Sequence, residues 1–143
     1  MTAKREKLLR FIAKDDIEVE EFPWGPHDWM SRPGLTEADH LLLVRVNMPP
    51  GKAHQFHCHP EMEEIIYVIS GKAEQWVEEE SKILSPGEMA HIPKNVVHGT
   101  YNPFDETLVF LAILAPAVFE GPPLVDVFEE EPWCNLKTPM YFD

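Results

Sequence analysis

One segment, residues 51–71, constrains the fold more than any other part of the chain. It reads GKAHQFHCHPEMEEIIYVISG and places His57 and His59 one residue apart, with Glu64 after an intervening proline. Alternate residues of an extended strand point to the same side, so the two imidazoles can reach one point in space. Glu64 begins an apolar run that can form a second strand and return to that point. The segment therefore favours two strands that converge on a shared polar site.

A second segment, residues 87–102 (GEMAHIPKNVVHGTYN), supplies one more histidine for such a site, His98. Three imidazoles and one carboxylate suit borderline first-row metals, namely Mn, Fe, Co, Ni, Cu or Zn. A metal that prefers six ligands would keep two positions open for water, dioxygen or a chelating substrate, whereas a tetrahedral zinc with four protein ligands would be closed. The sequence thus predicts a divalent metal site and leaves the identity of the metal open.

The two segments resemble the paired motifs of the cupin superfamily. The first motif is filled at every position, by Gly51, His57, His59, Glu64 and Gly71. The second is filled by Gly87, Pro93, Asn95, His98 and Asn102. Asn95 is the one departure, because glycine is usual there, and Asn tolerates the left-handed backbone better than most residues. The resemblance implies an all-β fold, a double-stranded β-helix or jelly-roll barrel, with the three histidines and Glu64 as metal ligands.

Further acids and histidines lie close to these motifs. Glu63 is the rival carboxylate, but counting back six residues from Gly71 selects Glu64 and leaves Glu63 pointing outward. His54 and His91 are interpreted as residues that support the site or lie at the surface, rather than as ligands. His91 could also line the pocket.

The rest of the chain is a series of short apolar runs separated by turns. Besides the strand of the paired histidines, strands are expected at residues 41–48, 65–69, 72–78, 82–84, 89–92, 99–101 and 107–115. Such a series without helix-length insertions indicates a β-sandwich or barrel. Residues 22–36 carry three prolines and two glycines and are interpreted as a long irregular loop. We expect one domain over residues 1–143, with a core at about 40–115, an N-terminal arm and a C-terminal tail.

Charge and apolar length exclude several classes of function. The chain has 25 acidic and 12 basic side chains, a net charge of −13, which repels phosphate backbones, so we expect no nucleic acid as a partner. The longest apolar stretch, residues 108–119, has twelve residues and contains Pro116, too short for a membrane span. The N-terminus lacks the apolar core of a secretory signal. We therefore expect a soluble, cytoplasmic protein without a membrane partner.

Two apolar runs, IIYVI and LVFLAILA, lack the alternation of a strand with one solvated face, so we expect both of their faces to be covered. A second subunit or the C-terminal tail could provide the cover. Cupins commonly dimerise through strand faces, so the resemblance implies a homodimer. We expect the tail to pack Val127, Phe128 and Trp133 against the barrel and to leave its acidic residues in water.

Residues that contact a substrate are harder to select. Arg45 lies in an apolar strand, where its guanidinium could bind a carboxylate or could equally pair with an acid outside. Tyr67 could face the cavity or simply pack, and His91 is a further candidate to line the cavity. Side chains of the irregular segment could wall the barrel mouth or only anchor the loop, namely Trp24, His27, Trp29 and Arg32.

The leading functional hypothesis is a metal-dependent enzyme that acts on a small carboxylate or chelating organic molecule. Oxygen-using cleavage of the dioxygenase type ranks first, with metal-assisted decarboxylation or isomerisation next. The alternative is a non-catalytic module that binds or senses a small ligand or a metal. The sequence assigns no catalytic acid or base, which keeps this alternative open.

Overall fold

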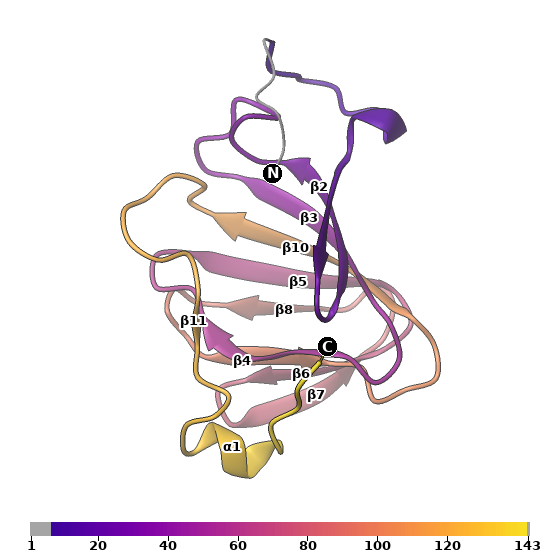
Figure 1. Cartoon of the computed structure of the whole chain (residues 1–143), viewed down its shortest axis with the longest axis vertical. Coiled ribbons are helices and arrows are strands. Elements are labelled where there is room, and N and C mark those ends of the chain that lie inside the picture. The colour runs from indigo at the N-terminus through magenta and orange to yellow at the C-terminus, as the bar shows by residue number, and fades with distance from the viewer. Residues whose placement is uncertain (1–6, 143) are drawn as a thin grey trace.

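The computed structural model describes residues 7–142 and consists mainly of two antiparallel β-sheets (Figure 1). The larger sheet contains, in spatial order, β1 (Glu18–Phe22), β2 (Gly25–Ser31), β3 (Leu42–Met48), β10 (Leu108–Ala115), β5 (Glu63–Ser70) and β8 (Met89–Ile92). The smaller sheet contains β11 (Val125–Asp126), β4 (Ala53–Cys58), β9 (His98–Tyr101), β6 (Ala73–Val77) and β7 (Glu80–Leu84). Helical structure is limited, in this part of the chain, to the short 3-10 turn η1 (Lys14–Asp16) and to α1 (Trp133–Leu136). The fold is the double-stranded β-helix, or jelly roll, that the sequence predicts.

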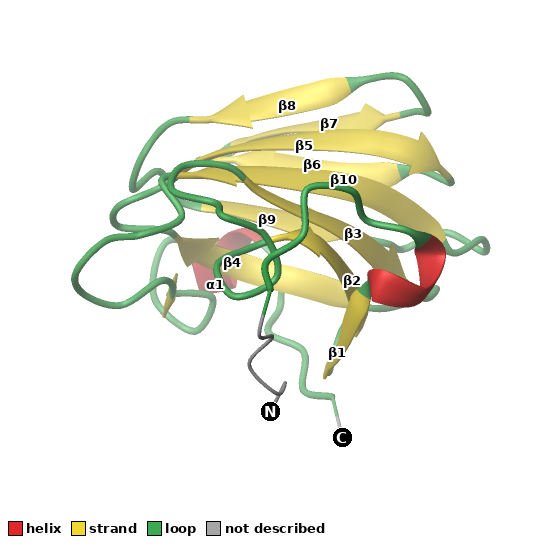
Figure 2. Cartoon of the chain, turned by 90° about the horizontal axis from the view of Figure 1, so that it is seen from above, coloured by secondary structure: helices red, strands yellow, loops and turns green. Residues whose placement is uncertain are grey.

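The two sheets face one another and enclose the interior (Figure 2). Along β10, every second residue is buried, and the alternate residues are only half-buried. Phe110 pairs with Val46 of β3, and Ala112 pairs with Val44. Because neighbouring strands keep their inward positions in register, their apolar side chains form one continuous inner face.

The structure differs from the prediction of an irregular loop at residues 22–36. β1 and β2 form a hairpin here, and β2 joins the sheet beside β3. Gly25 makes the turn at φ +126°, and a Cβ there would overlap the backbone oxygen of Asn47. Pro26 stands at the start of β2, before the pairing with β3 begins at His27, so its missing N–H removes no bond between these two strands. Proline and glycine therefore mark a strand end in this segment.

The C-terminal tail covers the smaller sheet. β11 pairs with β4, and Val127, Phe128 and Trp133 pack against the buried cluster around Phe56, as predicted. On the outer face of the larger sheet, by contrast, Tyr67 of β5 and Met89 of β8 are 38% and 45% exposed in the described part of the chain. Within residues 7–142, no helix has the length and apolar character needed to cross a bilayer.

Candidate metal centre

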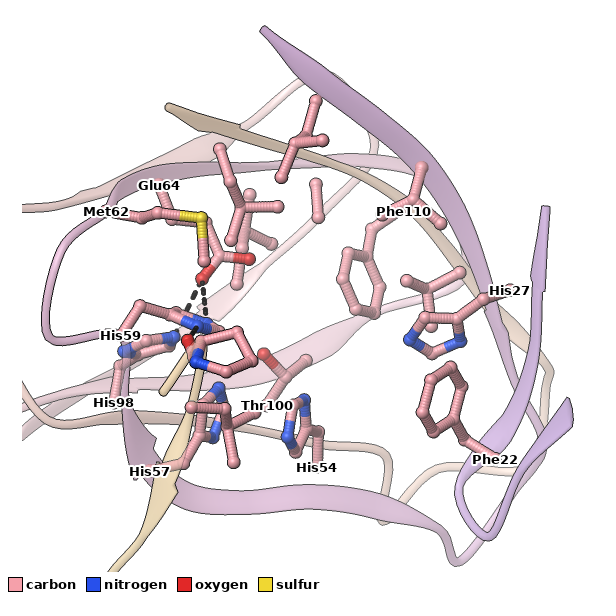
Figure 3. A pocket seen from close by; sticks show the side chains of 18 of the residues that line it. Phe22, His27, His54, His57, His59, Met62, Glu64, His98, Thr100 and Phe110 are labelled. Carbon is pink, nitrogen blue, oxygen red and sulfur yellow. Dashed lines mark hydrogen bonds and ion pairs between the residues drawn. The ribbon is translucent and has the colours of Figure 1, made fainter. Parts of the chain in front are cut away.

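Four buried side chains from separate places in the chain meet between the two sheets (Figure 3). His57 comes from β4 and His98 from β9, where the two residues are cross-strand partners. His59 follows the end of β4, and Glu64 reaches across from β5 of the larger sheet. The potential ligand atoms of these four residues all lie within 4.8 Å of one another. The four residues selected by their spacing in the sequence are therefore close enough to bind one ion.

The turn after β4 links the two sequence motifs. The carbonyl oxygen of His59 accepts hydrogen bonds from the amides of Met62 (3.3 Å) and Asn95 (3.0 Å). Asn95 adopts a φ of 63°, in the left-handed region, where asparagine is tolerated better than most residues. The substitution of asparagine for the usual glycine thus preserves the turn.

A backbone carbonyl fixes the orientation of each imidazole at the centre. The Nδ1 atoms hydrogen-bond the carbonyl oxygens of other residues, His57 to Gln55 (2.6 Å), His59 to Pro123 (2.9 Å) and His98 to Val96 (3.0 Å). A carbonyl oxygen only accepts, so each Nδ1 carries a hydrogen and donates it. In the neutral ring this leaves the lone pair on Nε2. The same outer contact orients metal-binding histidines in general.

The carboxylate of Glu64 lies against two of these imidazoles, at distances that need a proton or a metal ion between the atoms. Its Oε1 lies 2.8 Å from Nε2 of His98 and 3.2 Å from Nε2 of His59. With the hydrogen of each neutral ring on Nδ1, lone pairs would face the carboxylate at these distances. Either protons on the Nε2 atoms or a metal ion must lie between them. Imidazole nitrogen and carboxylate oxygen are the donors that first-row divalent metals take, so the residues fit such an ion. The cluster therefore has the composition and geometry to hold a divalent metal ion.

Burial and the neighbouring rings set the charge of the cluster. Burial acts to raise the pKa of Glu64, but the hydrogen bonds from His59 and His98 outweigh it and hold this pKa well below its usual value. Burial lowers the pKa of His57 well below the usual value. Burial also acts to lower the pKa of His59, but the carboxylate of Glu64 overcomes this and the pKa is raised. Metal binding must therefore displace protons from the site.

The cluster borders a cavity of about 490 Å³ between the sheets. Most of its lining side chains are apolar or aromatic, namely Phe22, Trp24, Trp29, Leu42, Val44, Val46, Met62, Ile66, Phe110, Ala112, Leu114, Ala117, Phe119, Pro123 and Leu124. Besides the four potential ligands, its polar lining residues are His27, His54 and Thr100. A cavity of this size and apolar character suits a small organic ligand with a few oriented polar groups.

Three residues that the sequence suggested for substrate contact lie elsewhere. Nε of Arg45 bonds Oδ2 of Asp28 at 2.9 Å, and Nε2 of His91 lies 2.8 Å from Oε1 of Glu63, with both pairs away from the cavity lining. Tyr67 also lies outside the lining. Each of the three alternates along its strand with buried or cavity-lining residues, so its side chain lies on the outer face of the sheet.

Other lining residues come from segments for which the sequence gave weaker indications. Trp24, His27 and Trp29, which were candidates to wall the barrel, do line the cavity, and so does His54. The contribution of the tail was missed: the carbonyl of Pro123 holds His59, 64 positions away in the sequence. No local sequence signal marks a backbone carbonyl as a partner over such a separation.

Known proteins match this chain in sequence and in fold. The family model described as the cupin domain matches residues 44–114. The pectin degradation protein KdgF of Dickeya dadantii is 31% identical over 109 residues, which cover 76% of this chain and 94% of KdgF. The structure of the polyketide cyclase RemF from Streptomyces resistomycificus superposes with a TM-score of 0.71 at 26% identity, covering 92% of this chain and 95% of RemF. KdgF from Halomonas sp. has a TM-score of 0.65 at 22% identity, covers 74% and 94%, and shares the fold.

Proposed function

The chain belongs to the cupin domain family, and from that premise we propose a metal-dependent enzyme that acts on a small, largely apolar molecule able to chelate through oxygen. His57, His59, Glu64 and His98 would hold the ion. The observation that carries the proposal is the position of this centre, because it borders a 490 Å³ apolar cavity instead of being sealed in the core. A substrate in the cavity can therefore reach the ligand cluster.

The residues of the chain would bind, orient and dehydrate the substrate. A bound divalent ion supplies Lewis-acid polarisation of oxygen atoms, or dioxygen chemistry where the metal is redox-active. The apolar walls exclude water, which strengthens electrostatic interactions at the centre. The backbone carbonyls that hold the three Nδ1 atoms keep the imidazoles in one orientation while substrates come and go.

The cavity lining favours one kind of chelator over another. The names of the two relatives refer to pectin degradation and to polyketide cyclisation. A sugar acid carries hydroxyl groups along most of its carbon chain and needs many polar partners. Here the hydroxyl of Thr100 already donates to Oε1 of Gln75 at 2.6 Å, and the walls are largely apolar. These features support a less hydroxylated molecule with a pair of chelating oxygens, such as a 1,3-diketone.

Metal analysis combined with a substrate panel tests the proposal. Protein purified without oxygen would be analysed for metal and then assayed with 1,3-diketones, catechols and 2-oxo acids, following both oxygen uptake and product formation. Iron with oxygen uptake supports a dioxygenase-like reaction, while turnover without oxygen supports decarboxylation, isomerisation or ring closure. Binding without any turnover would favour a binding or sensor module. Undiminished turnover by metal-free His59→Ala protein would overturn the proposal.

We also propose that the chain forms a homodimer through the outer face of the larger sheet. Apolar side chains follow one another across three neighbouring strands on this face, including Leu111 beside Tyr67 and Tyr67 beside Met89. Tyr67 and Met89 are 38% and 45% exposed, and contiguous exposed apolar surface marks interaction sites. Light scattering at micromolar concentration should give the dimer mass, and Tyr67→Glu should reduce it to that of the monomer. A monomeric wild-type mass would contradict the proposal.

A further inference from the structure

A buried ring nitrogen of one cavity histidine, His54, lacks a hydrogen-bond partner within residues 7–142. His54 lies on β4, three residues before His57, and lines the cavity without belonging to the four-residue cluster. Within residues 7–142 its buried Nε2 has no hydrogen-bond partner. Buried polar side-chain atoms nearly always have a partner in folded proteins, so an exception at a cavity wall points to a group that arrives with a ligand.

The ring of His54 is held in place by stacking. It lies between the indole of Trp24 (centroids 4.1 Å apart, planes at 11°) and the imidazole of His57 (3.6 Å and 9°). Figure 3 shows the ring beside His57 and Thr100, at the wall that leads away from the ligand cluster. The two neighbours prevent the ring from turning toward another partner. Its free nitrogen is therefore presented in a fixed position next to the metal centre.

The neighbouring polar groups of the cavity wall do not satisfy this nitrogen. Thr100 is already engaged with Gln75, and the indole N–H of Trp24 points to Nε2 of His27 at a long 3.4 Å. His27 packs on Trp24 as well, and its Nδ1 is a second buried nitrogen without a partner in the described chain. A neutral imidazole offers one donor and one acceptor, so either a hydroxyl or a carbonyl oxygen could bind.

We propose that His54 binds an oxygen of the substrate beyond the two that chelate the metal, and so helps to select which chelators enter. The inference rests on the proposed function, because it places the chelating end of the molecule at His57, His59, Glu64 and His98. The ligand class is an apolar molecule with a chelating oxygen pair and a third oxygen, as a hydroxyl or carbonyl, on an adjoining ring. An apolar chelator without the third oxygen leaves His54 unsatisfied and binds more weakly.

Matched probes isolate this contact in metal-loaded protein. Benzoylacetone is an aromatic 1,3-diketone, and its 3′-hydroxy and 4′-hydroxy isomers each add one oxygen on the ring. Dissociation constants would be measured for all three by calorimetry. In the wild-type protein, at least one hydroxyl isomer should bind roughly three- to tenfold more tightly than benzoylacetone, the gain expected of one hydrogen bond.

Substitutions at position 54 test whether the gain in affinity from the added hydroxyl depends on the His54 ring. His54→Phe keeps a flat ring between Trp24 and His57 and removes the nitrogens, so it should abolish the gain and leave the benzoylacetone affinity and the metal content unchanged. His54→Gln supplies an amide donor and should retain part of the gain. His91→Phe is the matched control, since His91 is exposed and pairs with Glu63 outside the cavity.

The outcomes separate this inference from the function on which it rests. If metal-loaded wild-type protein does not bind benzoylacetone, the proposed function and the role of His54 both fall. If benzoylacetone binds but neither hydroxyl adds affinity, or the gain persists in His54→Phe, only the role of His54 is overturned. Loss of metal from His54→Phe would also overturn it, because His54 would then belong to the metal centre. The wild-type comparison needs no variant and remains decisive where a variant does not fold.

Discussion

The two sheets contribute unlike walls to one cavity. The inner face of the larger sheet is mainly apolar, with Val46 and Phe110 paired across β3 and β10, whereas the smaller sheet presents His54, His57 and His98. Both walls are built from strands with the same alternation of side chains. They differ in how they are stabilised, since the apolar wall gains free energy by burial, whereas His57 and His98 gain it by hydrogen bonds to backbone carbonyls.

Glu64 connects the two walls. It is carried by β5 of the larger sheet and reaches the imidazoles of the smaller one. A metal held by these residues would therefore join the sheets as well as bind substrate. The comparison implies that substitutions of the potential ligands His57 and His98 change metal binding, and that substitutions on the apolar wall change stability with little effect on the metal.

The largest effect is expected at Glu64 itself. Glu64→Ala removes the buried carboxylate and should lower metal affinity by at least about 100-fold, more than the loss of a residue that only supports a ligand. Metal content after dialysis should fall from near one ion per chain to near zero. Glu63→Ala is the matched control, because Glu63 is the adjacent, exposed carboxylate. Full metal occupancy in Glu64→Ala would break the assignment of the centre.

The second test addresses the apolar wall. Phe110 is 4% exposed, and Phe110→Ala should lower the free energy of unfolding of the metal-free protein by about 3 kcal/mol, measured with denaturant. Part of its surface already borders the cavity, which favours the lower end of the usual range. Metal content should stay unchanged. Leu111→Ala, on the half-buried outer face of β10, is the control and should cost less. A marked loss of metal in Phe110→Ala would show that the walls are not separable.

Spacing within a strand made much of the fold and the metal centre predictable. The strands expected at residues 41–48 and 89–92 match β3 and β8 to within one residue, because turns and apolar runs bound them clearly. His57 and His59 share a side by strand alternation, and the second motif adds His98. Contacts between distant segments were not predictable. The carbonyl of Pro123 carries no side-chain signal, and the hairpin at Gly25 depends on its close approach to Asn47.

The direction in which a side chain points was also not predictable for strands that are apolar on both faces. The run LLLVRVNM does not indicate whether Arg45 or its neighbours point inward, since apolar residues occupy both parities. In the structure Val44 and Val46 line the cavity, and Arg45 therefore points outward. The sequence therefore leaves open whether Arg45 contacts a substrate or pairs with an acid outside, and the structure shows its pairing with Asp28.

The third test uses pH and is aimed at His54 and His57 of the imidazole wall. Burial lowers the pKa of His54 and His57 well below 6.5, so both rings stay neutral in the folded, metal-free protein while the unfolded chain takes up protons below that pH. Stability should therefore fall as the pH drops below 6.5, and the contribution of each such ring approaches about 1.4 kcal/mol per pH unit once the pH is well below 6.5. The raised pKa of His59 acts in the opposite sense, since its stabilising contribution is present below pH 6.5.

A substitution that preserves the ring stack tests how much of this pH dependence of stability comes from His54. In metal-free His54→Phe, the loss of stability between pH 6.5 and 5.5 should be smaller than in the wild type by about 1 kcal/mol, measured by denaturant unfolding at each pH. The control His91→Phe should keep the wild-type slope, because His91 is exposed. Equal slopes for wild type and His54→Phe would mean that His54 is not held neutral in the wall.

The smallest effect is expected on the outer face, at Arg45. Its ion pair with Asp28 is 2.9 Å long, but the arginine side chain is 40% exposed, and such pairs contribute only about 0–1 kcal/mol. Arg45→Met should therefore lower the free energy of unfolding by less than about 1 kcal/mol and leave metal content and benzoylacetone affinity unchanged. The strand keeps Val44 and Val46 on the cavity side whichever residue stands between them. A loss of benzoylacetone binding in Arg45→Met would place the guanidinium in contact with substrate and contradict the division between inner walls and outer face.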